Sequence, residues 1–144
     1  MKLLVTGANG LLGQKLISLS ASLQEISFIA TGRGENRNPP GKYEYRQLNV
    51  TSREEVSTVF KEINPDVVIN CAAMTHVDQC ETHQEACWSQ NVTALEYLIA
   101  SSIEANALLI QLSTDFIFDG LAGPYTEEAL ANPLCYYGKS KLAS

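Results

Sequence analysis

Two side chains near the end of the sequence have the types and the spacing of an acid–base pair. Tyr137 and Lys141 are four residues apart in a Y-x-x-x-K arrangement, and residues with this separation share a helix face. A free tyrosine has a pKa of about 10, which a nearby ammonium group lowers because it favours the phenolate. The pair is a candidate general acid or base near neutral pH. The alternative is an accidental pairing on an exposed helix.

Hydroxyl and carboxyl groups stand just upstream of this pair. Ser113, Thr114 and Asp115 come at the end of the apolar segment 107–113, which predicts a strand. Because ligands of open parallel sheets bind beyond the carboxyl ends of the strands, these side chains are candidates for contact with a substrate. A hydroxyl there could hydrogen-bond a reacting carbonyl oxygen. The alternative is a turn or a helix cap.

Three glycines near the start of the chain predict a phosphate-binding turn. Gly7, Gly10 and Gly13 follow the apolar run Lys2–Val5 in a G-x-x-G-x-x-G pattern. In such a corner the glycines permit a tight turn, close approach of the backbone to a pyrophosphate, and close packing of the next helix. The N–H groups at the start of that helix then bind the anion. The helix is indicated by leucines at helical spacing, namely Leu12, Leu16, Leu19 and Leu23.

The elements that must position these groups alternate along the chain. Further strands are expected at 26–31, 43–50, 67–70 and 107–113, and helices at 51–63 and 85–105. Such alternation predicts right-handed crossovers and an α/β fold with a doubly wound parallel sheet. The helix over 85–105 would bury a stripe that comprises Trp88, Val92, Leu95, Leu98, Ile99 and Ile103. A last helix begins near Tyr136 and the sequence stops at Ser144, so we expect a Rossmann-like domain that is truncated at its C-terminus.

Charge and composition exclude several classes of protein. A chain of 144 residues with a net charge of −6 and no basic run is not expected to bind nucleic acid. No apolar stretch reaches the roughly 18 residues of a membrane helix, and the N-terminal apolar core is too short for a signal peptide. Four cysteines without a C-x-x-C pair favour reduced thiols and a cytoplasmic location.

In combination, these motifs resemble the extended short-chain dehydrogenase/reductases, and more narrowly their dTDP-4-dehydrorhamnose reductase branch. The stretches that carry the resemblance are 6–13, 65–78, 91–92, 113–120 and 137–141, with "AAxTxVDxxE" and "STDxxFDG" the most specific to this branch. The resemblance implies a Rossmann-like NAD(P)-binding domain over residues 1–144, with the substrate-binding part missing. It also implies NADPH-dependent reduction of the C4 ketone of a dTDP-4-keto-6-deoxysugar, from dTDP-4-dehydrorhamnose to dTDP-L-rhamnose.

The same resemblance implies a role for each site residue. Tyr137 would donate a proton to the C4 ketone as the cofactor delivers hydride, assisted by Thr114 and by Lys141, which would also hold the nicotinamide ribose. Thr114 and Asp115 would contact the sugar. The other cofactor contacts would come from Gly7, Gly10, Leu11, Leu12 and Gly13 at the turn, from Asn49 and Val50 beside the adenine, and from Ala73, Met74 and Thr75 along the ribose and nicotinamide. Two positions depart from the family, which often has Asp at Asn49 and usually has Asn at Cys135.

The end of the second predicted strand bears on the choice of cofactor. An acidic side chain there favours NAD, whereas an arginine suits the 2′-phosphate of NADP. The chain has Thr31-Gly32-Arg33 and no acid before Glu35. We therefore expect NADP, with NAD as the alternative.

Other functions stay open from the sequence. A relative of the family is a regulatory subunit of methionine adenosyltransferase, the beta type, and sugar-nucleotide epimerases share the same machinery. The Thr114, Tyr137 and Lys141 set favours an enzyme over a regulator, which has no need of an acid. The expected partners are a nucleotide-sugar substrate and, because helices near this element often pair in the superfamily, a second copy in a homodimer. No metal is expected: a soft-metal site would need a continuous helix over His76, Cys80, His83 and Cys87, and in the family 75–78 is a loop.

Overall fold

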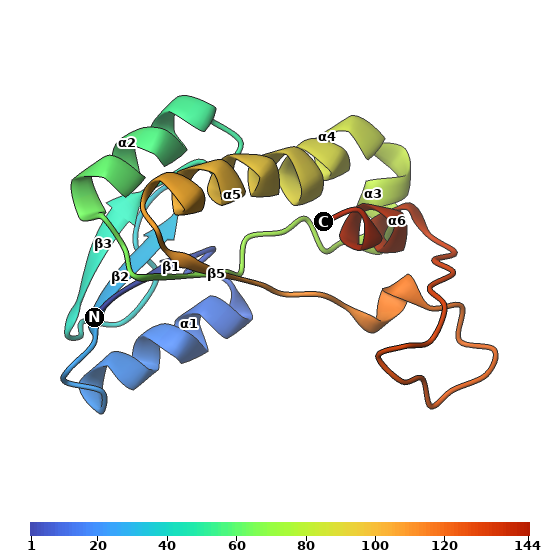
Figure 1. The fold of residues 1–144 in the computed structure, drawn as a ribbon, viewed down its shortest axis with the longest axis horizontal. Helices are drawn as coiled ribbons and strands as arrows, with labels where there is room; N and C mark the ends of the chain where they lie inside the picture. The colour runs from blue at the N-terminus through green and yellow to red at the C-terminus, as the bar shows by residue number, and fades with distance from the viewer.

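The computed structural model describes residues 1–144 as one five-stranded parallel sheet with helices on both faces (Figure 1). The strands are β1 (Lys2–Thr6), β2 (Ser27–Gly32), β3 (Tyr43–Gln47), β4 (Val67–Asn70) and β5 (Leu108–Gln111). They lie in the order β3-β2-β1-β4-β5, and every pairing is parallel. The predicted doubly wound sheet is confirmed. Because the strand order reverses at β1 and β4, a crevice opens beyond their carboxyl ends.

Helix α1 (Leu11–Ser18), extended by the 3-10 turn η1 (Leu19–Ala21), covers one face of the sheet, and α2 (Arg53–Ile63) and α5 (Ala94–Glu104) cover the other (Figure 1). The remaining elements gather beyond the carboxyl ends of the strands. They are α3 (Val77–Thr82), α4 (Gln84–Trp88), the π-helical segment η2 (Ser89–Thr93), the 3-10 turn η3 (Asp115–Ile117) and α6 (Tyr136–Leu142). No helix has the length and apolar character needed to cross a membrane.

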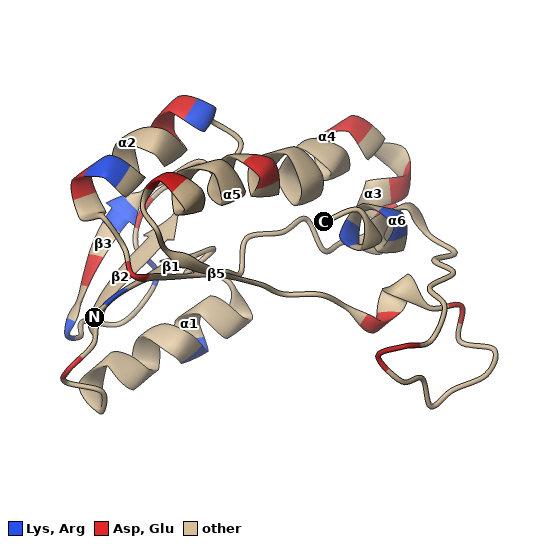
Figure 2. Ribbon diagram, in the orientation of Figure 1, with Lys and Arg blue, Asp and Glu red and all other residues tan.

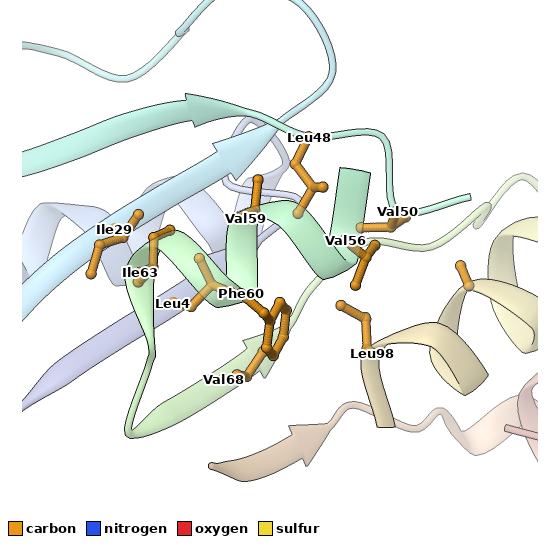
Figure 3. Close-up of a cluster of buried hydrophobic side chains, with 11 residues drawn as sticks. Leu4, Ile29, Leu48, Val50, Val56, Val59, Phe60, Ile63, Val68 and Leu98 are labelled. Carbon is orange, nitrogen blue, oxygen red and sulfur yellow. The ribbon is translucent and has the colours of Figure 1, made fainter. Parts of the chain in front are cut away.

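The larger core lies between the sheet and the α2–α5 face (Figure 3). Leu4 of β1, Val68 of β4, Val56 of α2 and Leu98 of α5 are all completely buried there. Each such aliphatic side chain contributes roughly 1.5–3 kcal/mol when it is removed from water. This core fixes the strands whose ends carry the site.

The leucine repeat predicted on the first helix is not its buried face. Leu12, Leu19 and Leu23 are exposed, whereas Gly13 and Ile17 point into the protein. A Cβ atom at Gly13 would lie 2.4 Å from the Gly7 carbonyl oxygen. Because Gly13 lies in close contact with the glycine turn, the face of α1 that carries Gly13 and Ile17 packs on the sheet. The leucines lie on the exposed side of the helix.

The apolar stripe predicted over 85–105 is also only partly buried. Val92, Leu95 and Leu98 are buried, but Trp88 is 41% exposed and Ile103 is 74% exposed. The π-helical segment η2 interrupts the helical repeat between Trp88 on α4 and the buried residues of α5, while Ile103 lies on the solvent side of α5 itself. Because a π turn holds one residue more than an α turn, side chains before and after it no longer share one face. Trp88 packs instead near the ring of Tyr136 at the surface.

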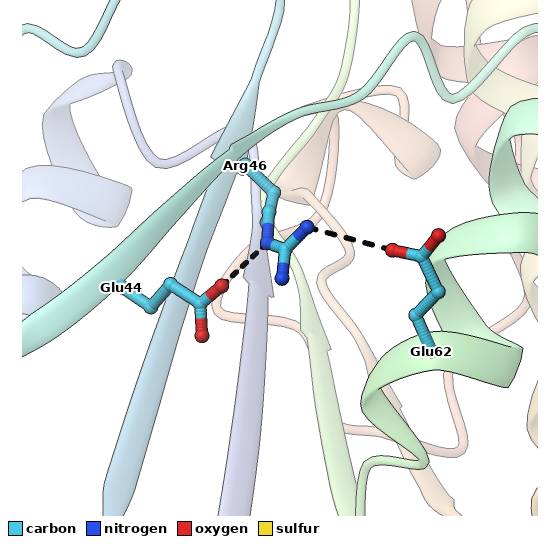
Figure 4. Close-up of polar contacts among 3 residues, drawn as sticks. All are labelled: Glu44, Arg46 and Glu62. Atoms are coloured by element: carbon cyan, nitrogen blue, oxygen red, sulfur yellow. Dashed lines mark hydrogen bonds and ion pairs between the residues drawn. The ribbon is translucent and has the colours of Figure 1, made fainter.

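Polar contacts mark the ends of α2. Ser52 caps its first turn by accepting a hydrogen bond from the Glu55 N–H at 3.3 Å, as the sequence pattern predicts. Near the other end, Glu62 pairs with Arg46 of β3 at 3.5 Å, and Arg46 also contacts Glu44 (Figure 4). All three side chains are about half exposed, so solvent screens these ion pairs and they contribute little to stability.

Beyond the carboxyl ends of the strands, acidic and basic side chains lie on different helices. The segment α3–α4 carries acidic residues only, whereas α6 carries basic ones (Figure 2). Glu81 of α3 accepts a hydrogen bond from the Tyr136 N–H at 2.6 Å. An acidic helix thus holds the start of the helix that bears the tyrosine–lysine pair.

Candidate functional site

The glycine turn after β1 has the shape of an anion cradle. Gly7 has a φ of +62°, and a Cβ atom there would lie 2.7 Å from the Ala72 nitrogen. The turn therefore requires glycine at this position. Helix α1 begins after Gly10 with no side-chain cap, so its first N–H groups stay available to a bound anion.

On the β2 side of this turn lies a pocket of about 330 Å³. Gly32 and Arg33 at the end of β2 line it, together with Arg37 from the following loop. Leu48 and Val50 form an apolar wall. Two guanidinium groups beside an apolar wall suit a phosphorylated ribose that carries a flat base.

On the β4 side lies a second pocket, of about 340 Å³. It is lined by Leu12 of α1, Thr75 after β4, Ser113 after β5, and Tyr137 and Lys141 of α6. Both pockets share Gly10 and the segment Cys71–Ala73. They therefore form two lobes of one groove that crosses the glycine turn, which is the form needed by an elongated ligand with a central diphosphate.

Tyr137 and Lys141 both line the second lobe, in agreement with the shared helix face that their four-residue spacing predicts. Tyr137 is 9% exposed and Lys141 is 6% exposed. The Lys141 ammonium donates a hydrogen bond to the Leu112 carbonyl at 2.7 Å. Burial lowers the pKa of Lys141 from its ordinary value, because a desolvated ammonium is less stable. The Tyr137 ring lies edge-on to Phe116, with ring centroids 5.6 Å apart.

Thr114 and Asp115 lie outside the lining of this groove. The Thr114 hydroxyl accepts a hydrogen bond from the Phe116 N–H at 3.3 Å and donates to Asp115 at 3.2 Å. Thr114 thus caps η3, which was the alternative interpretation of this motif. Because the chain turns into η3 directly after Ser113, the Ser113 residue lies at the groove instead. Asp115 lines a separate pocket beside Phe118 and Tyr125.

Two predicted cofactor contacts also lie outside the groove lining. The Asn49 side chain accepts hydrogen bonds from the Thr51 N–H and hydroxyl, and Leu48 takes its place at the apolar wall. Met74 packs against the buried cluster formed by Cys80, Cys87 and Tyr137. Its neighbours on both sides, Ala73 and Thr75, do line the groove.

Sequence reasoning missed several residues at the site. Arg37 stands in a glycine- and proline-rich loop that has no fixed register in sequence, although its charge was visible. The Asn9 side chain anchors that loop by accepting from the Arg37 N–H at 2.9 Å and donating to the Glu35 carbonyl at 3.0 Å. Gln90 reaches the β2-side lobe from η2, and only the tertiary structure could reveal it.

The departure from the family at Cys135 leaves the helix start intact. Cys135 is the N-cap of α6, and its sulfur accepts a hydrogen bond from the Gly138 N–H at 3.3 Å. The thiol therefore supplies a cap at a position where the family usually has an amide. The helix that carries Tyr137 begins at the expected place.

The histidine–cysteine series does not form a metal-binding group. His76 and His83 flank α3 at its two ends, and the helix breaks at His83. Cys80 and Cys87 are buried and all four cysteines are free. No group of three or more His, Cys, Asp or Glu side chains has an arrangement that could hold a metal ion.

Comparison with known proteins assigns the family. The family model described as RmlD substrate binding domain matches residues 1–144. The chain belongs to this family. It is 35% identical over 141 residues to dTDP-4-dehydrorhamnose reductase of Aggregatibacter actinomycetemcomitans, covering 97% of the chain and 44% of that protein. It is 36% identical over 141 residues to methionine adenosyltransferase 2 subunit beta of Bos taurus, covering 98% and 40%.

Solved structures agree with this family assignment. The hypothetical dTDP-4-dehydrorhamnose reductase of Sulfolobus tokodaii superposes with a TM-score of 0.84 at 35% identity, covering 99% of the chain and 50% of that structure. The reductase of Bacillus anthracis in complex with NADP gives a TM-score of 0.77 at 30% identity, covering 99% and 46%. The predicted resemblance and the Rossmann-like fold are confirmed. The chain spans less than half the length of the curated relatives that it matches.

Proposed function

We propose that these 144 residues form the NAD(P)-binding, acid–base part of a dTDP-4-dehydrorhamnose reductase. The observation that carries the proposal is the two-lobed groove, which joins a glycine anion cradle to the buried Tyr137 and Lys141. A reductase of this type needs both a dinucleotide site and a proton donor in contact. The 35% identity to the Aggregatibacter enzyme supports the same assignment.

The groove fits NADP at each part of the cofactor. The cradle at Gly7, which a side chain would fill, and the free N–H groups of Leu11 and Leu12 would hold the pyrophosphate, beside Gly10 and Gly13. Arg33 and Arg37 would bind the 2′-phosphate, with Val50 and the backbone at Asn49 beside the adenine. The NADP complex of the Bacillus anthracis relative supports this choice, and NAD stays the alternative.

The second lobe would hold the reacting end. When bound, the cofactor supplies hydride to the C4 carbon of the sugar. Lys141 would hold the nicotinamide ribose next to the segment Ala73–Thr75, which includes Met74. Tyr137 would give its phenolic proton to the C4 oxygen, which neutralises the negative charge that develops there and yields the hydroxyl. Burial of both groups keeps water away from the proton transfer.

We propose that residues at the start of η3 contact the sugar. Thr114 and Asp115 lie next to Phe116, which packs on Tyr137, so a nucleotide sugar entering beside the tyrosine would meet this turn. Further sugar contacts would come from a substrate-binding part beyond these residues, because the relatives are more than twice as long. A cytoplasmic location and a homodimer stay predictions.

The test is NADPH consumption in the presence of dTDP-4-dehydro-L-rhamnose, by the protein in the longest form that its gene encodes. We expect Tyr137→Phe to lower the rate by about 10²–10⁴-fold, the usual contribution of general acid catalysis, while NADPH binding persists. Tyr136→Phe is the matched control, because Tyr136 does not line the groove, and should keep the rate. Equal rates for wild type and Tyr137→Phe would contradict the assignment of the proton donor.

A regulatory function is the second candidate, because the identity to methionine adenosyltransferase 2 subunit beta is 36%. This regulatory function would be favoured if the protein binds NADPH but converts no nucleotide sugar. Interconversion of sugar nucleotides without net consumption of the cofactor would favour an epimerase. The buried tyrosine–lysine pair supports the reductase over the regulator.

A further inference from the structure

Ser140 is a buried junction on the helix that carries the tyrosine–lysine pair. Its side chain is completely buried. The hydroxyl donates a hydrogen bond to the Tyr137 carbonyl at 2.7 Å and accepts one from the Asn91 amide at 2.9 Å. The Cys87 thiol donates to the same oxygen at 3.4 Å. Ser140 therefore joins α6 to the α4–η2 segment through buried hydrogen bonds.

Asn91 continues this connection to the wall of the groove. Its side-chain oxygen accepts from the Met74 N–H at 2.8 Å, and its amide group donates to the Met74 carbonyl at 3.1 Å. Asn91 thus occupies both backbone groups of Met74, and it is only 2% exposed. Met74 stands between Ala73 and Thr75, which line the second lobe.

The helix geometry accounts for the position of Asn91. It lies in the middle of the π-helical segment η2, and such segments are rare and concentrate at functional sites. The wider turn places the Asn91 amide between Met74 and Ser140, which belong to different elements. The first lobe has a separate anchor, because the Asn9 side chain holds the loop after β2 that carries its arginines.

We propose that Asn91 and Ser140 are positioning residues that hold the Met74 segment and the Tyr137 helix at a fixed separation. The inference rests on the proposed function, in which the nicotinamide end of the cofactor lies between these two walls. Loss of the bridge leaves buried polar groups unpaired and lets α6 move relative to Met74. Binding of the nicotinamide end is then weakened, while binding of the adenine end is not.

The experiment compares two ligands by calorimetric titration of the protein in the longest form that its gene encodes. NADPH needs both lobes, whereas adenosine 2′,5′-bisphosphate needs only the first. Ser140→Ala should weaken NADPH binding about tenfold, the effect of losing one buried hydrogen bond, and leave the bisphosphate affinity unchanged. Ser102→Ala is the matched control, because Ser102 is buried on α5 and its hydroxyl has no hydrogen-bond partner. It should change neither affinity.

A second variant guards against a loss of folding. Asn91→Asp keeps an acceptor for the Met74 N–H but offers no donor to Ser140, and it should reproduce the selective loss of NADPH affinity. Unchanged NADPH affinity in both variants would overturn the inference and leave the proposed function intact. Equal losses for both ligands would also overturn it, because they would show a purely structural role. A wild-type chain that binds neither ligand would overturn the proposed function itself.

Discussion

A single carboxylate, Asp119, organises the long segment between η3 and α6. The Tyr125 hydroxyl donates to it at 2.5 Å, and the Leu121 N–H and the Asn132 side chain each donate at 3.0 Å. These contacts, the Tyr125 hydroxyl first, lower the pKa of Asp119 to about 2. Because the folded pKa lies below the ordinary value of 3.8, the carboxylate stabilises the segment above that value. This contribution is lost as the pH falls toward 2.

At the scale of this residue we predict a pH-dependent difference between wild type and Asp119→Ala. The variant should unfold at a lower temperature at neutral pH, because three donors lose their acceptor. The gap in melting temperature should narrow between about pH 5 and pH 2 as the wild-type carboxylate is protonated. Thermal unfolding followed by circular dichroism measures both. Glu128→Ala, which alters an exposed carboxylate in the same segment, is the control, and a gap that stays constant across this range would refute the prediction.

At the scale of elements, α6 is seated on η3 with no room for a side chain. A Cβ atom at Gly138 would lie 2.2 Å from the Phe116 carbonyl oxygen and 3.0 Å from the Pro133 side chain. The glycine after Tyr137 therefore allows the helix to approach the turn that carries Thr114. Helix α6 is therefore held at two places: Gly138 contacts η3, and Ser140 is hydrogen-bonded to Asn91 of η2.

Gly138→Ala should separate these two elements. We expect a loss of about 1–3 kcal/mol in the free energy of unfolding, the usual cost of overpacking, together with weaker NADPH binding. Chemical denaturation and ligand titration check the two effects. The matched control is Gly123→Ala, whose Cβ atom would meet the Tyr125 ring at an ordinary 3.7 Å. A Gly138→Ala variant as stable as this control would show that α6 and η3 are not in close contact.

At the scale of the whole molecule, the core between the sheet and α2–α5 holds the strand ends that build the groove. Leu98 is completely buried in this core, whereas the adjacent Ile99 is 42% exposed. Sequence periodicity assigned both to one buried stripe. The structure assigns them to different faces of α5, because adjacent residues of an α-helix point about 100° apart and only one side of α5 packs on the core.

Paired substitutions test that assignment. Leu98→Ala should cost about 2–5 kcal/mol of unfolding free energy because it leaves a cavity in a packed core. Ile99→Ala should cost less than about 1.5 kcal/mol, since much of this side chain is already in water. Urea denaturation of the two variants gives both values. Equal costs would restore the stripe predicted from the sequence.

Local features of the chain could be predicted from the sequence alone. The order of strands and helices, the glycine corner, the cap at Ser52 and the shared helix face of Tyr137 and Lys141 depend on residues within a few positions of each other. Hydrophobic periodicity and backbone sterics act over that range, so the sequence determined the α/β class and where the groove should lie.

Contacts between distant segments were decided only by the tertiary structure. Asn91 and Ser140 are 49 residues apart, and nothing in their neighbours predicts that they meet. The buried face of α1, the turn of Thr114 toward η3 and the approach of Arg37 to the groove likewise depend on how elements pack. Hydrophobic burial and close packing involve the whole chain at once, whereas a sequence pattern shows only what adjacent residues favour.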